Sequence, residues 1–194
     1  MSKDEIRVSL LAMKYSRVLW DKYNPKAENP EPKCKSSNGE ISTGGNLYKQ
    51  AQICAQCKFA QWSKDGTPPL CNDVYQLLMW DHQDEFPFII SAKRTSIYPL
   101  RKLKTALKMT ARKWAWPDTV ANASVSILMK TKQVENYWVL DFPQRDHRGA
   151  PLWQRLPEEK SLELTKVAYD LSKTFSELDL NEPGDQTETE ATPN

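Results

Sequence analysis

The chain has 194 residues, of which 39% are hydrophobic and 27% are charged, and its formal net charge is +2. Its mean hydropathy is -0.68, and no apolar run approaches the ~20 residues that a membrane helix needs, so the composition argues against a membrane protein. It predicts a globular cytoplasmic protein of one domain with a sizeable insertion.

The charge is unevenly distributed along the chain. The first 175 residues carry 27 basic and 19 acidic side chains, a net of +8, and no Lys or Arg follows Lys173. The last stretch, 179–194, has neither an apolar period nor an aromatic residue, so we predict a disordered acidic tail. A basic body with an acidic end points to an anionic partner for the body.

The first 47 residues contain one regular segment and one long loop. Residues 6–20 alternate apolar positions as a strand does, although the same residues also fit a helix that Ser2 and Glu5 could cap; we favour the strand. Residues 24–47 are dense in Pro, Gly, Asn and Ser, which predicts a loop. A loop of this length in a compact domain needs something to hold it.

Regular patterns follow. Strands are predicted at 73–82 and 86–92, a helix from Pro99 to about Trp114, a hairpin at 123–132 and 136–142, and a helix at 157–178. Five strands with a helix between the third and fourth is the element order of an OB-fold. We therefore predict a mainly β protein with helices: a five-stranded OB-like barrel at 1–150, a cysteine-bearing insertion at about 24–72 after the first strand, a C-terminal helical extension at 151–178 and the tail at 179–194.

The four cysteines occupy 38 residues of that insertion, with the spacing C-x19-C-x2-C-x13-C. Two thiolates two residues apart can bind one tetrahedral Zn²⁺, and the other two complete a structural site. We predict structural zinc, although four unligated thiols with a redox pair, or His82 in place of one cysteine, remain alternatives. A catalytic zinc is disfavoured because both histidines lie outside the cluster. The predicted ligands are Cys34, Cys54, Cys57 and Cys71.

A basic and aromatic surface is the second candidate site. Between Phe86 and Trp116 there are eight Lys or Arg residues and no acidic one, which favours phosphate binding over a merely solvated face. Aromatic side chains next to such a surface stack on unpaired bases. The predicted nucleic-acid-binding residues are Lys93, Arg94, Arg101, Lys102, Lys104, Phe59, Trp62, Tyr75, Trp80 and Tyr137.

Catalytic motifs are not found in the sequence. It contains no phosphate-binding Walker loop, no G-x-G-x-x-G, no H-E-x-x-H and no G-x-S-x-G. We therefore expect a binding protein and not an enzyme.

Three stretches, "KCKSSNGE", "CAQCKFAQWSKDGTPPLC" and "FPFIISAKRTSIYP", form a succession that resembles a group of bacteriophage-encoded proteins. The resemblance covers roughly residues 6–115 and implies a zinc-containing OB-fold that binds single-stranded DNA. It implies that the four cysteines are the ligands, that the basic run after the third strand faces the DNA, and that the host cytoplasm is the location. The acidic tail is similar in charge to the tails through which such proteins recruit partners, although it lacks a terminal aromatic residue.

The leading hypothesis is therefore a sequence-independent binder of single-stranded DNA, with RNA also possible, in phage DNA replication or recombination. Replication or recombination proteins would bind the tail, and no membrane is involved. The alternative is a zinc-stabilised protein-interaction module that modulates a host or phage enzyme. A metal-dependent nuclease is a third and weaker hypothesis.

Overall fold

A computed structural model describes residues 5–20, 32–45, 47, 50, 52–134 and 137–178. These residues form two compact units. The larger unit comprises 5–16 and 73–178, and the smaller unit comprises the described part of 17–72. The predicted acidic tail at 179–194 lies outside the described residues.

The larger unit is built on a sheet whose strand order is β4-β3-β1-β5-β6. The printed registers are antiparallel: Leu77 of β3 pairs with Ile90 of β4, Arg7 of β1 with Leu128 of β5, and Thr131 of β5 with Leu140 of β6. The two-residue strand β7 pairs with the start of β5. The long strands are β1 (Glu5–Leu19), β3 (Asn72–Asp81), β4 (Phe86–Lys93), β5 (Val125–Val134) and β6 (Tyr137–Asp141), and β7 is Gln154–Arg155.

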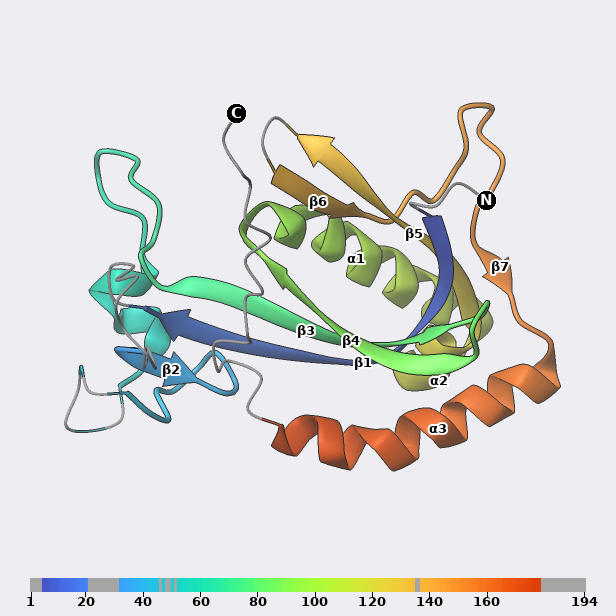
Figure 1. Ribbon diagram of the computed structural model, residues 1–194, viewed down its shortest axis with the longest axis horizontal. Helices are drawn as coiled ribbons and strands as arrows, with labels where there is room; N and C mark the ends of the chain where they lie inside the picture. Colours follow the sequence, from blue (N-terminus) through green and yellow to red (C-terminus); the bar gives the residue numbers. More distant parts are fainter. Residues whose placement is uncertain are drawn as a thin grey trace, which may run out of the picture. The chain divides into compact units, whose positions relative to one another are not determined.

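Helix α1 (Ile97–Trp114) covers one face of this sheet (Figure 1). Its leucines recur at helical spacing, so Leu100, Leu103 and Leu107 fall on one side and are almost completely buried. They pack in one cluster with Val8 and Leu77 of the sheet. The helix ends at Ala115, whose φ of 53° is left-handed, and the Ala115 N–H bonds the Arg112 carbonyl. The exposed side of α1 is therefore fixed by the leucines on its inner side.

Helix α3 (Glu158–Glu177) lies on the opposite side of β1, β3 and β4 (Figure 1). Alternation along β3 turns Trp80 away from the α1 cluster, and Lys160 of α3 lies over its ring, with Nζ 5.4 Å from the centroid. Leu164 and Phe175 are the buried side chains of this helix, and Lys14 of β1 donates to carbonyl groups at its C-terminal end. The short helix α2 (Asp118–Ala123) connects α1 to β5.

The smaller unit contains little regular structure. Its strand β2 (Cys34–Ser36) pairs with residues 17–19 at the end of β1, so that Cys34 lies opposite Leu19. Two 3-10 turns follow, η1 (Cys54–Gln56) and η2 (Lys58–Ala60). A third turn, η3 (Arg94–Ser96), precedes α1 in the larger unit.

The predicted strands and helices are confirmed within one to three residues, including the strand at the N-terminus. The barrel is wrong. Among the described strands the sheet path ends at β4 on one side and β6 on the other, so the sheet is open. Element order sets which strands are neighbours along the chain, whereas closure needs a pairing between the two edges that no local pattern encodes. None of the described helices combines the length and apolarity that crossing a bilayer requires.

Candidate functional site

The four cysteines of the smaller unit line one small pocket, together with Phe59 and Leu19. Backbone hydrogen bonds hold three of them. The Cys57 N–H bonds the Cys54 carbonyl at 3.1 Å, the Cys71 N–H bonds the Phe59 carbonyl at 2.8 Å, and the Cys54 N–H bonds a carbonyl of the preceding loop at 2.7 Å. The spacing in the sequence therefore brings all four side chains to one place.

A glycine next to the pocket is required by close packing. Gly45 has a φ of +100°, and a Cβ at this position would lie 2.4 Å from the Lys33 carbonyl oxygen and 2.6 Å from the Cα of Cys34. Any side chain would therefore displace the strand that carries Cys34.

Burial and neighbouring thiols raise the pKa of two of the cysteines. Burial first, and then the other three cysteines, raise the pKa of Cys71 to about 12, against a lowering influence of Arg17. Burial and then Cys54 and Cys57 raise the pKa of Cys34. A cation among the sulfur atoms would act against both shifts.

The pocket has a volume of about 10 Å³, which is the space of a single water-sized particle. Within the described ranges, no set of three or more Cys, His, Asp or Glu side chains has the arrangement of an assembled metal site. The sulfur atoms share a pocket without standing at coordination geometry. His82, the alternative ligand, belongs to the larger unit, where its Nε2 is 2.9 Å from the Ser9 hydroxyl.

The basic residues predicted from the sequence lie on the surface of the larger unit. Leucine burial turns the cationic side chains of α1 outward: Arg101, Lys102, Lys104, Lys108, Arg112 and Lys113 are exposed, as are Lys93 and Arg94 before the helix. Arg101 pairs with Asp73 at 3.6 Å. The Lys102 ammonium lies 4.5 Å from the ring centroid of Tyr98. The helix itself contains no acidic residue, so the charged side chains that it contributes to its outer face are all positive.

Two of the predicted aromatic residues are not available on this surface. Trp80 is only 9% exposed, because it points to the side of the sheet where Lys160 of α3 covers it. Tyr75 is half-buried against the core, and its ring centroid is 4.9 Å from that of Tyr15. Trp80 and Tyr75 are therefore largely covered in this structure, and base stacking by them stays an untested prediction. Only the backbone of Tyr137 is described, and its side chain lies outside the described part.

The aromatic residues of the cysteine-rich segment are more accessible. Trp62 is 68% exposed, and Phe59 is half-buried at the thiol pocket with the Lys58 ammonium 5.0 Å from its ring centroid. They belong to the smaller unit, so the structure does not place them on the surface of α1.

Four residues that the sequence did not predict as binding residues lie near the two ends of α1. Tyr98 is 66% exposed at the start of the helix. At its end the rings of Trp114 and Trp116 are 5.2 Å apart, and the Arg155 guanidinium lies 4.5 Å from the Trp116 centroid. Tyr98 and Trp116 flank the basic run in the sequence, which is a usable signal. Arg155 comes from a distant connector, and nothing local indicates it.

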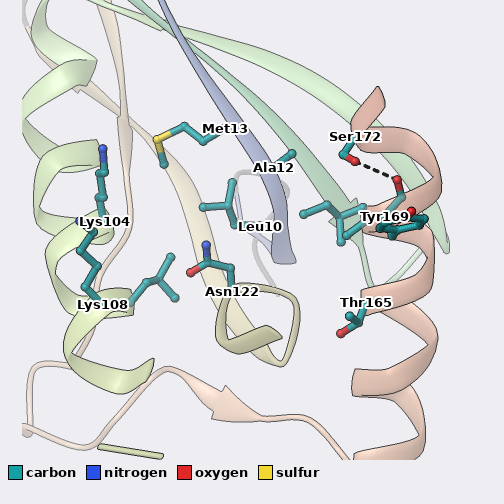
Figure 2. Close-up of a pocket in the computed structure, with 12 residues that line it drawn as sticks. Leu10, Ala12, Met13, Lys104, Lys108, Asn122, Thr165, Tyr169 and Ser172 are labelled. Atoms are coloured by element: carbon teal, nitrogen blue, oxygen red, sulfur yellow. Dashed lines mark hydrogen bonds between the residues drawn. The ribbon is translucent and has the colours of Figure 1, made fainter. Parts of the chain in front are cut away.

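A cavity of about 460 Å³ lies beside the basic face of α1, within the larger unit (Figure 2). Its floor comes from β1, with Leu10 and Met13. Lys104 and Lys108 stand on the α1 wall, and Tyr169 stands on the α3 wall. The sequence prediction contained Lys104 but had no means to pair it with α3.

Comparison with known proteins finds no matching family model, no similar curated protein and no similar solved structure.

Proposed function

We propose that the protein binds single-stranded DNA without sequence preference, through the outward face of α1. The observation that carries the proposal is the charge of this face. Its six Lys and Arg side chains are exposed, the helix itself contains no Asp or Glu, and one of the six, Arg101, pairs with Asp73 of β3. A surface that serves only solubility mixes both signs of charge, whereas a surface of one sign attracts phosphates and gains from counterion release.

The aromatic residues at the two ends of α1 favour the binding of single-stranded DNA over that of double-stranded DNA. Tyr98 and Trp116 lie at opposite ends of the basic run, each with a cationic group over its ring. Unpaired bases can stack on such rings, while the bases of a duplex are already stacked on one another. RNA offers the same phosphates and base faces, so it is a second substrate to test.

The strand order supports an OB-like ancestry for the open sheet. Counted in chain order, the five long strands lie third, second, first, fourth and fifth, with α1 between the third and the fourth. This is the neighbour order of an OB-fold, here without the closing edge-to-edge pairing. Together with the resemblance of residues 6–115 to phage proteins, it suggests a role in phage DNA replication or recombination.

The thiol pocket would hold a structural Zn²⁺ through Cys34, Cys54, Cys57 and Cys71. Four thiols are the donor type that Zn²⁺ prefers, and they share one pocket, so their chemistry fits this metal although the structure does not hold them at coordination geometry. The metal would order the smaller unit, and no reaction step is assigned to it.

The test is a fluorescence anisotropy titration with a fluorescein-labelled oligo-dT at several salt concentrations. We expect affinity that falls steeply as salt rises, and a Lys108→Glu, Arg112→Glu double variant that binds at least tenfold more weakly with a smaller salt slope. Lys132→Glu, an exposed lysine of β5, is the matched control and should bind as the wild type does. Absence of binding at low salt would overturn the proposal.

One observation favours the second candidate, a zinc-stabilised protein-interaction module. Among its described residues the smaller unit exposes four large apolar side chains: Ile41, Ile53, Trp62 and Leu70. A contiguous exposed apolar patch is typical of a protein-binding surface. A chain that binds no oligonucleotide but loses an enzyme partner after Trp62→Ala would support this candidate.

A further inference from the structure

The cavity between α1 and α3 results from the way the sheet is built. Strand β5 pairs with residues 5–8 of β1 and begins at Val125, so β1 continues beyond the start of its neighbour. Helix α2 fills only part of the space, with Asn122 at the edge of the cavity. Leu10 and Met13 both border the α1 cluster although they are an odd number of residues apart. The strict alternation of side chains along β1 is therefore interrupted between these two residues.

One wall of the cavity is cationic. Lys104 and Lys108 are one helical turn apart on α1, and both are exposed at the cavity (Figure 2). Among the described residues neither has an ion-pair partner, and none of the described residues lining the cavity is acidic. The two lysines of this wall are therefore available to bind an anion, and the floor beneath them is apolar.

The other wall carries an aromatic side chain of α3, and a carboxamide of α2 lies close by. Tyr169 of α3 is 81% exposed, although it stands beside apolar side chains. The Thr165 and Ser172 hydroxyls donate to carbonyl groups of their own helix, at 2.7 and 2.8 Å. The Asn122 carboxamide has no hydrogen-bond partner within the described part of the chain, so it is free to bind a ligand.

We propose that this cavity accepts one nucleobase of the bound single strand. Tyr169 stacks on the base, the Asn122 carboxamide bonds its edge, and Lys104 and Lys108 hold the flanking phosphates. A carboxamide can donate and accept at once, as base edges do, whereas a purely apolar ligand would leave it unpaired. The inference rests on the proposed function and adds a base contact in the cavity beside the outer face of α1, where Lys104 and Lys108 stand.

The test compares two labelled probes on the full-length chain: an oligo-dT and an oligomer of the same length whose central nucleotides are abasic. Stacking contributes about 1–3 kcal/mol per base, so Tyr169→Ala should weaken oligo-dT binding about tenfold and leave the abasic oligomer unchanged. Asn122→Ala should act in the same direction. Leu162→Ala, an exposed α3 residue outside the cavity, is the matched control.

The lysines should behave differently. Lys104→Ala and Lys108→Ala should weaken binding of both probes and each lower the salt slope by about 1. Photocrosslinking with 5-iodouracil in the oligomer gives a readout that does not depend on variants, and the crosslink should fall on the peptide that contains Tyr169.

Three outcomes would overturn the inference. If Tyr169→Ala and Asn122→Ala bind oligo-dT as the wild type does while Lys108→Glu, Arg112→Glu loses binding, the base cavity is wrong and the proposed function stands. A crosslink that falls only outside the cavity has the same meaning. If the wild-type chain binds neither probe, both proposals fail together.

Discussion

The larger unit buries a continuous cluster of aliphatic side chains between its sheet and α1, whereas the described residues of the smaller unit contribute only Val18, Leu19 and Cys54 to the buried hydrophobic set. A unit with so little apolar burial cannot offset the conformational entropy of its loops unless another interaction contributes. Four thiols in one pocket provide the groups for such an interaction. One region is thus held by packing, and we expect the other to be held by a metal.

Removal of the metal should have the largest effect. Structural zinc can contribute about 10 kcal/mol or more to folding, so a chelator or Cys57→Ser should unfold the smaller unit. Mass spectrometry of tryptic fragments should then show rapid cleavage within 17–72 and protection of 73–178. Metal analysis should find one zinc per untreated chain.

The matched control is Lys58→Ala, next to Cys57, which should keep both the metal and the protection. A purified chain that contains no metal and still resists cleavage in 17–72 would show that packing alone orders this unit, and the contrast between the two regions would be lost.

Truncation of a side chain in the aliphatic core should have the next largest effect on stability. This effect should be confined to the larger unit. Leu103 is 1% exposed in the cluster under α1, so Leu103→Ala should lower the free energy of unfolding by about 2–5 kcal/mol. Thermal unfolding followed by circular dichroism measures this loss, with the exposed Leu162→Ala as control. Zinc content should not change, and loss of zinc at temperatures where Leu103→Ala remains folded would mean that the two regions depend on each other.

A buried polar group in the larger unit makes a finer test of its packing. Gln76 on β3 is completely buried, and neither atom of its carboxamide has a hydrogen-bond partner among the described residues. Gln76→Leu removes this desolvation cost at similar volume, so it should raise the free energy of unfolding by about 1 kcal/mol. Urea unfolding measures the change, and Gln83→Leu in an exposed turn should give none. A destabilised Gln76→Leu would reveal a role for the carboxamide.

Local sequence patterns were sufficient to predict the long strands and helices. They were not sufficient to predict whether the sheet closes into a barrel. Period-two and period-3.6 spacing located every long strand and helix, because burial of one face imposes these periods wherever the element lies. The open sheet could not be predicted, since an edge pairing joins residues far apart in the sequence. Trp80 shows the same limit: alternation predicts that it faces away from Leu77 and Met79, but only the fold shows that α3 covers that side.

The same limit applies to the candidate sites: local sequence predicted some of their residues, and only the fold shows the others. The cysteine spacing predicted a shared pocket, because the four residues lie within 38 positions and adjacent turns bring them together. The cationic run predicted the outer face of α1, because its leucines fix the inner face. Tyr169 and Arg155 were missed, since each comes from an element distant in sequence from α1, and Asn122 was missed because only the fold brings the short connecting helix α2 to the cavity.

The smallest predicted effect is a pH dependence of the larger unit. The Ser9 hydroxyl donates to the Val125 carbonyl at 2.8 Å, so it accepts from His82 Nε2–H at 2.9 Å. Burial first, and then Lys160 and Arg7, lower the pKa of His82 from 6.5 against the opposite influence of Asp81 and Glu85. The stability from neutral His82 is therefore complete above about pH 6.5 and is lost as pH falls below it.

Acid also acts on the smaller unit, because protons compete with a metal for thiolates. The readout must therefore be local: amide hydrogen exchange in β1 and β5, measured between about pH 7.5 and pH 5. His82→Gln should flatten the pH dependence of exchange in these strands, whereas His147→Gln in an exposed loop should retain it. An unchanged slope in His82→Gln would assign the acid sensitivity to the thiol pocket alone, and the two regions would then differ in their response to protons as they do in packing.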